Sequence, residues 1–451
     1  MSSLFSQPTA DEPGGRYASV ASSRGFRSLL GSTATSALGS SITSVALSWL
    51  IYHYTGNPLD IAYLGLTGVA PGIALGLFAG VLADRYDRRR LMVASDTVRA
   101  AAMAILAVVL WLGGFSLPII LAAMTLVYSF SSLFFPASQA LLPKIVSQAQ
   151  LEDANGILSA SSQLGFSLGS GLGGLIIAAV GALAGLGINA ATYAVSAMFL
   201  FQIAPELGRV RSRTPAANRS MFAEMGEGFA YMRSHLPILE VTLGFLPGSM
   251  LFPLITNYFV VYASVVLGPN PTIYGYLVAS FTVGMAGGSL LVGRLQARRF
   301  AGQAMAYALL VMSGATMVLV LGRGLGTALT GALVVGLAVG LIGTTYYSTM
   351  QAIVPNEVLA RVLSIDMVGS LVAVPAGLLL GGVLAGSRGV LFSYEVAAAG
   401  FLANGLLFLA LPGVRSLRYV APRAGTHPSP RLESSKSWPG DTQPAQRGRN
   451  L

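Results

Sequence analysis

The sequence contains no cysteine, and it contains only three histidines among 451 residues. Without cysteine the protein has no disulfide, no thiolate ligand for a metal and no cysteine nucleophile. The histidines, His53, His235 and His427, lack the spacing of metal ligands. We therefore expect no metal, no cofactor and no enzymatic activity, and a polytopic membrane enzyme is a disfavoured alternative. The Gly-x4-Gly-Lys-Ser/Thr loop that holds ATP phosphates is also missing, which argues against an ATP-driven pump.

Charged residues are scarce as well, at 10% of the chain, whereas 54% of the residues are hydrophobic. A soluble domain carries about 25% charged residues. This chain cannot cover itself with polar surface, so we expect the lipid bilayer to surround it. The 54 glycines suit membrane helices, which approach one another closely through small residues. The net charge of +10 is spread over loops and tails, so we expect no nucleic-acid partner.

Twelve apolar runs are long enough to cross a bilayer, which takes about twenty residues. The predicted spans are 26–53, 59–82, 91–113, 117–142, 152–179, 182–203, 238–266, 272–293, 303–322, 325–352, 360–386 and 390–412. All but three of the 27 Lys and Arg residues fall on one side of these spans, which the positive-inside rule assigns to the cytoplasm. We therefore expect a multi-pass protein of the cell (cytoplasmic) membrane with both termini in the cytoplasm.

An internal repeat relates the two halves of the chain. A shift of 213 positions places Asp153 and Gly156 on Asp366 and Gly369. The pattern indicates a duplication and predicts an all-α membrane protein with twelve transmembrane helices in two pseudo-symmetric six-helix bundles. The expected division is an N-terminal tail at 1–24, a first bundle at 25–203, a linker with an amphipathic helix at 204–237, a second bundle at 238–412 and a disordered basic tail at 413–451.

A charged turn with the sequence GVLADRYDRRRLM, residues 80–92, separates the second and third spans. It holds six charges within seven positions, so it must lie outside the hydrocarbon. Topology alone can explain the arginines, because basic loops are retained on the cytoplasmic side. Topology does not explain the spacing of the residues that share this turn: Gly80, Leu82, Asp84, Arg85, Arg88 and Arg89.

This spacing resembles the signature of the major facilitator superfamily, a family of secondary transporters, although Asp87 stands where the family usually has Gly. The resemblance implies transport by alternating access and a conformational-switch role for the turn. It also implies that Asp84 contacts the cytoplasmic end of the eleventh span, near 357–361. In the second half Ala297 replaces this acid, so the two halves are not mechanically equivalent.

The span at 152–179 carries a ladder of small residues: Gly156, Gly165, Gly169, Ser170, Gly173 and Gly174. This spacing resembles the antiporter motif of the drug exporters in the superfamily, with Ser170 in place of the motif's proline. Ordinary packing of small residues between membrane helices is the alternative explanation. Both interpretations place this face of the helix against a neighbouring helix.

Ionisable residues inside spans are functional candidates, because they are costly to insert into a membrane. The coupling candidates are Asp96, Arg99, Asp366 and Glu395. Asp96 and Arg99 lie three positions apart on one helical face, so a structural ion pair is their first interpretation. Asp366 and Glu395 are the better candidates for protonation, and protons are the candidate coupling ion.

Polar and aromatic side chains on the spans predict the character of the substrate cavity. The candidates are Tyr128, Ser132, Gln163, Asn257, Tyr258 and Tyr346. A mostly apolar pocket with a few polar groups suits an amphipathic organic molecule. The alternative is that these side chains pack, or form hydrogen bonds, within the protein.

The segment FFPASQALLP at 134–143, followed by Leu151-Glu152-Asp153-Ala154-Asn155, resembles the bacterial exporter branch that contains enterobactin-type siderophore and macrolide efflux proteins. The resemblance implies a monomeric secondary exporter of amphipathic small molecules such as drugs or siderophores, with proton antiport as one form of coupling. A transporter of lysophospholipids or other metabolites with the same fold and a non-transporting membrane receptor are the alternatives.

Overall fold

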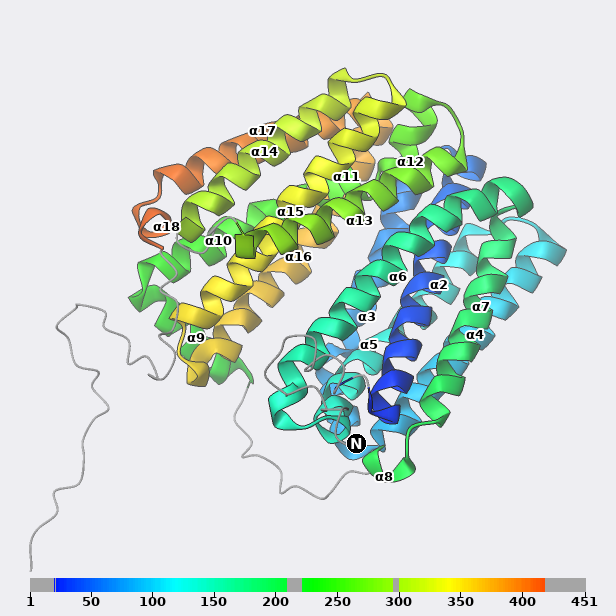
Figure 1. The fold of residues 1–451 in the computed structure, drawn as a ribbon. Helices are drawn as coiled ribbons and strands as arrows, with labels where there is room; N and C mark the ends of the chain where they lie inside the picture. The colour runs from blue at the N-terminus through cyan, green and yellow to red at the C-terminus, as the bar shows by residue number, and fades with distance from the viewer. Residues whose placement is uncertain (1–19, 21, 209–220, 295–299, 418–451) are drawn as a thin grey trace, which may run out of the picture.

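The computed structural model describes residues 20, 22–208, 221–294 and 300–417, which form helices joined by short loops (Figure 1). The helices before the linker are α2 (Arg24–Thr55), α3 (Pro58–Arg85), α4 (Arg88–Gly113), α5 (Leu117–Ile145), α6 (Leu151–Val180), α7 (Ala182–Phe201) and α8 (Pro205–Gly208). Those that follow are α9 (Met221–Ser234), α10 (Leu236–Leu251), α11 (Pro253–Thr256), α12 (Phe259–Tyr262), α13 (Pro271–Arg294), α14 (Ala301–Leu321), α15 (Leu325–Ile353), α16 (Asn356–Arg388), α17 (Val390–Ala410) and α18 (Pro412–Ser416).

One helix accounts for each predicted span except that at 238–266, although the helices end one or two residues early at 182–203, 303–322 and 390–412. Eleven helical segments within the described residues are long and apolar enough to cross a membrane, and Leu236–Leu267 is one of them. The range 59–82 is covered by α3, which has 28 residues. The fold is therefore all-α, as the sequence predicts.

The predicted span at 238–266 is broken into α10, α11, α12 and a short π-helix (Ala263–Leu267). Pro247 lies inside α10, and Pro253 begins α11. Proline has no backbone N–H and its ring clashes with the preceding turn, so it interrupts a helix. One break falls at Phe252, directly before Pro253, and the other falls at Asn257 and Tyr258, two of the predicted cavity residues.

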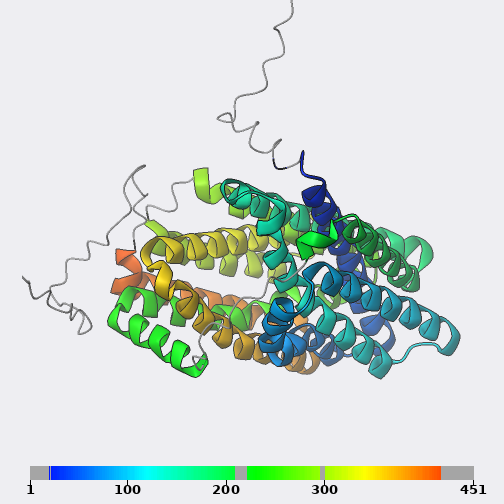
Figure 2. The ribbon, with the colours of Figure 1, turned by 90° about the horizontal axis from the view of Figure 1, so that it is seen from below.

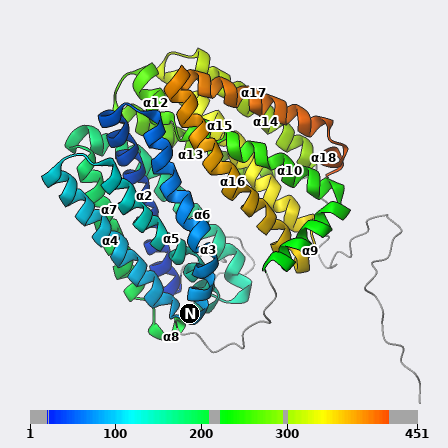
Figure 3. The ribbon, with the colours of Figure 1, turned by 180° about the vertical axis from the view of Figure 1, so that it is seen from behind.

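The long helices form two groups, which we call the first half (α2–α7) and the second half (α10–α17). Figures 1 and 3 show the halves close together at one end and apart at the end that carries α8 and α9, and Figure 2 shows them side by side from below. The contacts between the halves are made by α6 with α13, by α3 with α16, and by α2 with α12 and α13.

The expected amphipathic helix of the linker is α9. It packs against the start of α16, where a Cβ on Gly228 would lie 3.0 Å from the carbonyl oxygen of Arg361. Met232 is fully buried, whereas Phe229 is exposed. The linker helix therefore rests on the second half at the end where the halves are apart (Figure 1).

Candidate functional site

The charged turn is built from two helix ends. Helix α3 ends at Arg85 and α4 begins at Arg88, with Asp87 as its N-cap. The Oδ1 atom of Asp87 accepts a hydrogen bond of 2.9 Å from the backbone N–H of Arg90. An N-cap carboxylate satisfies a free N–H of the first helical turn. This capping explains why an acid stands where the family pattern has glycine.

Arg89 ties the turn to the end of α7. Its Nε donates to the carbonyl oxygen of Leu200 at 3.0 Å, and its Nη2 donates to that of Phe201 at 2.8 Å. The guanidinium also lies over the Phe201 ring, 5.5 Å from its centroid. A cation at a helix C-terminus compensates the negative end of the helix dipole. The C-terminal part of the turn is therefore fixed within the first half.

The side chains of Gly80, Leu82, Asp84 and Arg85 lie outside the part of the chain that the structure describes, as does that of Glu357. The contact of Asp84 with the eleventh span therefore stays a prediction. Arg88 is half-buried at the start of α4.

The glycine ladder of α6 faces α2. A Cβ on Gly165 would lie 2.8 Å from the carbonyl oxygen of Ala34, and a Cβ on Gly169 would lie 2.6 Å from the Oγ of Ser41. A Cβ on Gly173 would come within 3.3 Å of the Cα of Ile42. These glycines allow α2 and α6 to approach backbone to backbone.

The same ladder also reaches the second half. A Cβ on Gly174 would lie 2.6 Å from the carbonyl oxygen of Pro271 and 3.0 Å from the Cα of Gly275 on α13. A Cβ on Gly275 would in turn lie 2.8 Å from the carbonyl oxygen of Ser170. Gly156 differs, because no described atom comes within 4 Å of a Cβ built on it. The motif residues therefore serve two helix contacts, one within the first half and one between the halves.

Asp96 and Arg99 form an ion pair inside the first half, with exposures of 0% and 5%. The other carboxylate oxygen of Asp96 accepts a hydrogen bond of 2.5 Å from Ser196 on α7. The Ser196 hydroxyl lies 2.7 Å from that of Ser32 on α2. The acid is thus held by three helices, because α4 supplies it and α2 and α7 supply the hydroxyls.

The guanidinium of Arg99 is held on its other side by α5 and α7. Its Nη1 donates to Ser131 Oγ at 3.2 Å. The Cζ atom lies 4.8 Å from the Phe134 ring centroid and 4.5 Å from that of Tyr193. A cation between two aromatic faces is stabilised by their quadrupoles, the more so away from water. Ser32, Ser131, Phe134, Tyr193 and Ser196 were not among the predicted site residues.

The other coupling candidates have different surroundings. Asp366 is half-buried on α16, within electrostatic range of Tyr346 and Tyr347 on α15. Glu395 is exposed near the start of α17. Of the two, Asp366 is the half-buried one, and a predicted cavity residue, Tyr346, lies within its electrostatic range.

Two cavity candidates of the broken helix contribute to packing at the end of the molecule where the two halves are close together, which we call the closed end. Asn257 donates a hydrogen bond of 3.1 Å to the carbonyl oxygen of Ile61 on α3, which joins the two halves. Tyr258 is fully buried, and its hydroxyl donates to the carbonyl oxygen of Leu378 on α16. Both side chains are therefore engaged at the end where the halves meet.

The remaining cavity candidates lie on three other helices. Ser132 donates to the carbonyl oxygen of Ser129 in its own helix, at 2.7 Å. Tyr128 is half-buried and packs near Gly68 of α3, and Gln163 is half-buried on α6. Tyr346 is 2% exposed and lies against Phe245, with ring centroids 4.3 Å apart. In the described part of the chain, no group of three His, Asp or Glu residues could hold a metal ion.

The helical fold, the close helix contacts and the buried charges define a multi-pass membrane transporter of the major facilitator class. The model of the family described as "Transmembrane secretion effector" matches residues 16–434, so the chain belongs to that family. The members of the family are transporters, not enzymes. The substrates of such transporters are small molecules.

Relatives with known names cover most of the chain. It is 27% identical over 402 residues to the multidrug efflux pump Tap of Mycolicibacterium fortuitum, covering 85% of this chain and 94% of Tap. It is 25% identical over 391 residues to macrolide efflux protein A of Streptococcus pyogenes, covering 81% and 90% of the two chains.

Solved structures share the fold. The peptide transporter POT in complex with sulfate aligns with a TM-score of 0.65 at 14% identity, covering 88% of this chain and 96% of that one. A bacterial homologue of the human lysosomal transporter Spinster, in an inward-facing and unoccupied conformation, aligns with a TM-score of 0.63 at 14% identity, covering 87% and 96%. At this identity the likeness concerns the fold alone.

Proposed function

We propose that this protein is a secondary exporter that moves amphipathic small molecules, including drugs, across the cell membrane by alternating access. The observation that supports it best is the way in which the halves meet. Their contacts join the C-terminal part of α6 to the start of α13, and the start of α3 to the end of α16. With both termini in the cytoplasm, this end faces outward, and the conformation is open to the cytoplasm.

The names of the relatives support the direction of transport and the kind of substrate. Tap and macrolide efflux protein A are both efflux proteins, and each aligns along most of its length. Siderophores and lysophospholipids share the amphipathic character of drugs, and they belong in any substrate panel.

In this proposal the two six-helix bundles are the moving bodies and the protein acts as a monomer. The turn at 80–90 acts as the conformational switch. The α6 ladder holds α6 against α2 within the first half and provides the contact with α13 that changes during the cycle. Proton antiport is the proposed form of coupling. Asp366 is the favoured carboxylate, because it is half-buried beside Tyr346, whereas Glu395 is exposed. Asp96 is the second candidate, because its charge is already balanced by Arg99.

The test is efflux from vesicles reconstituted with the purified protein under an imposed pH gradient. The panel contains macrolides, other amphipathic drugs, a siderophore and a lysophospholipid. We expect at least one amphipathic compound to move faster than in protein-free vesicles, and we expect dissipation of the pH gradient to slow it. Transport at a rate that does not depend on the pH gradient would contradict proton antiport but not export. Absence of movement for every compound would contradict export and favour a non-transporting receptor.

A further inference from the structure

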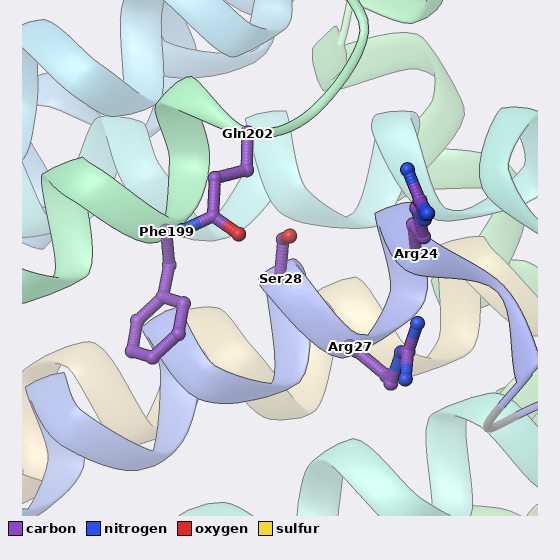
Figure 4. A pocket seen from close by; sticks show the side chains of 5 residues that line it. All are labelled: Arg24, Arg27, Ser28, Phe199 and Gln202. Atoms are coloured by element: carbon purple, nitrogen blue, oxygen red, sulfur yellow. The ribbon is translucent and has the colours of Figure 1, made fainter.

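A polar pocket lies between the start of α2 and the end of α7, away from the contacts between the halves. It has a volume of about 450 Å³ and is lined by Arg24, Arg27, Ser28, Phe199 and Gln202 (Figure 4). We call it the α2–α7 pocket. None of its residues belongs to the charged turn, the glycine ladder or the buried ion pair.

The two arginines leave positive charge unbalanced at this pocket. Both occupy the first turn of α2, which contains no acidic residue. The N-terminal end of a helix dipole is positive, so cations are disfavoured there and anions are favoured. Both side chains are exposed, and within the described part of the chain neither forms an ion pair. An anion in the pocket would offset both the dipole and the two guanidinium charges.

Ser28 adds a polar group to the pocket that does not depend on the arginines. The residue is only 5% exposed, and its hydroxyl points into the pocket between Gln202 and Arg24 (Figure 4). Among the described residues it has no hydrogen-bond partner. Its oxygen is open to the pocket rather than enclosed by protein, so a molecule in the pocket can form a hydrogen bond with it. The hydroxyl, the Gln202 amide and two guanidinium groups together form a set of donors that suits phosphate oxygens.

The apolar side of the pocket lies beside exposed apolar side chains of α7. The Phe199 ring packs on α2, where a Cβ on Gly31 would lie 3.1 Å from it. Next to it, Met198 and Phe201 are 58% and 60% exposed on a predicted membrane span. Polar donors thus lie beside an exposed apolar surface at a helix end, where the headgroup of a lipid would be found.

We propose that the α2–α7 pocket binds a phosphate-bearing anion, with the headgroup of an anionic membrane lipid as the expected source and free phosphate as the other. The bound phosphate would accept hydrogen bonds from Arg27, Arg24 and Ser28 and would join α2 to α7. Retention of these arginines on the cytoplasmic side requires only their charge. It requires neither a pocket nor a hydroxyl that opens into that pocket.

The test measures ligand binding, so its result is independent of which compound is exported. The full chain is purified in detergent, stripped of lipid and exposed to phosphatidylglycerol, phosphatidylcholine or inorganic phosphate. Retained lipid is measured by native mass spectrometry, and the thermal unfolding midpoint reports stabilisation by each anion. The variants are Arg27→Gln and Ser28→Ala, with Arg233→Gln as the matched control. Arg233 is also an exposed arginine, on α9.

We expect phosphatidylglycerol to be retained in preference to phosphatidylcholine. Arg27→Gln should weaken its apparent affinity about tenfold or more, since hydrogen bonds between charged groups are the strong ones. Ser28→Ala should weaken it by a smaller factor, and Arg233→Gln should leave it unchanged. Stabilisation by inorganic phosphate that is lost in Arg27→Gln would support the site with a soluble anion as its ligand.

Two results would overturn the proposal. Equal losses in Arg27→Gln and Arg233→Gln would mean that diffuse positive charge attracts the lipid, without a site. Binding of neither phosphatidylglycerol nor phosphate to the wild-type protein would mean that the pocket holds no phosphate. Neither result would bear on export.

Discussion

Two opposite charges, Asp96 and Arg99, are enclosed by four helices of the first half. Removing charged groups from water is costly, and their attraction repays the cost only when each group is also hydrogen-bonded. Asp96 meets this condition through Ser196. Arg99 meets it in part: Ser131 and two aromatic rings hold the guanidinium, while its Nε has no hydrogen-bond partner among the described residues. The pair therefore holds α4 in register with α5 and α7.

The substitution Asp96→Asn should destabilise the protein by about 3–5 kcal/mol, because it leaves the Arg99 charge buried without a counter-charge. The loss is measured as a lower thermal unfolding midpoint of the purified protein. The double variant Asp96→Leu/Arg99→Met should recover most of that stability. Transport by the recovered double variant decides the role of the pair: proton-driven efflux at the wild-type rate would mean that the pair is structural only.

A substitution at Asp84 tests whether the charged turn acts as the conformational switch. The substitution Asp84→Asn should slow transport without preventing insertion, because it removes a contact made in one conformation only. A loss of about 1 kcal/mol changes the ratio of the two conformations about fivefold, which accessibility labelling can detect. The matched variant Ala297→Asn removes no charge and should have a much smaller effect. Equal, small effects at both positions would mean that the turn serves topology only.

At the scale of helices, the α6 ladder shows how a small-residue motif can join three helices. Gly165, Gly169 and Gly173 recur every four residues and face α2, whereas Gly174 is turned toward α13. Backbones that touch need glycine on at least one side. Because α6 contacts both halves, its small residues affect both the first half and its contact with the second.

The substitution Gly169→Leu should abolish transport, because a Cβ there already meets Ser41 Oγ at 2.6 Å. Overpacking of this kind costs about 1–3 kcal/mol. Gly156→Leu is the matched control, because it lies in the same helix with no described atom within 4 Å of its Cβ position. In efflux assays at equal expression, Gly169→Leu should be inactive and Gly156→Leu should remain active. Normal efflux by Gly169→Leu would contradict the close α2–α6 contact.

The spans could be predicted from sequence because hydropathy and length depend only on local composition. Interruptions such as that at Pro253 depend on local sequence as well, so the prolines were an available signal for the broken helix. The partners of Asp96 could not be predicted, because Ser196 lies 100 positions away in the chain and meets it only through packing. The ladder predicted that a neighbouring helix would be close, but packing determines that the neighbours are α2 and α13.

At the scale of the whole molecule, alternating access requires that the contacts between the halves at the closed end break during the cycle. Leu59 of α3 and Gly382 of α16 lie at that end, where a Cβ on Gly382 would be 3.1 Å from the Cα of Leu59. The two backbones therefore lie at the short end of the range that a disulfide spans, whose Cα atoms are about 4.4–6.8 Å apart. The chain has no cysteine of its own, so an introduced pair of cysteines can form a disulfide only with each other within the chain.

The double variant Leu59→Cys/Gly382→Cys should therefore form a disulfide under mild oxidation and stop transport, and a reductant should restore transport. Each single-cysteine variant serves as a control for the substitution itself, and neither should respond to oxidant. The cross-link is measured as a mobility shift after proteolytic cleavage in the linker, and efflux is measured on the same vesicles. Transport at the normal rate by a fully cross-linked protein would mean that the two ends need not separate, and the rocking of one half against the other would then be excluded as the transport mechanism.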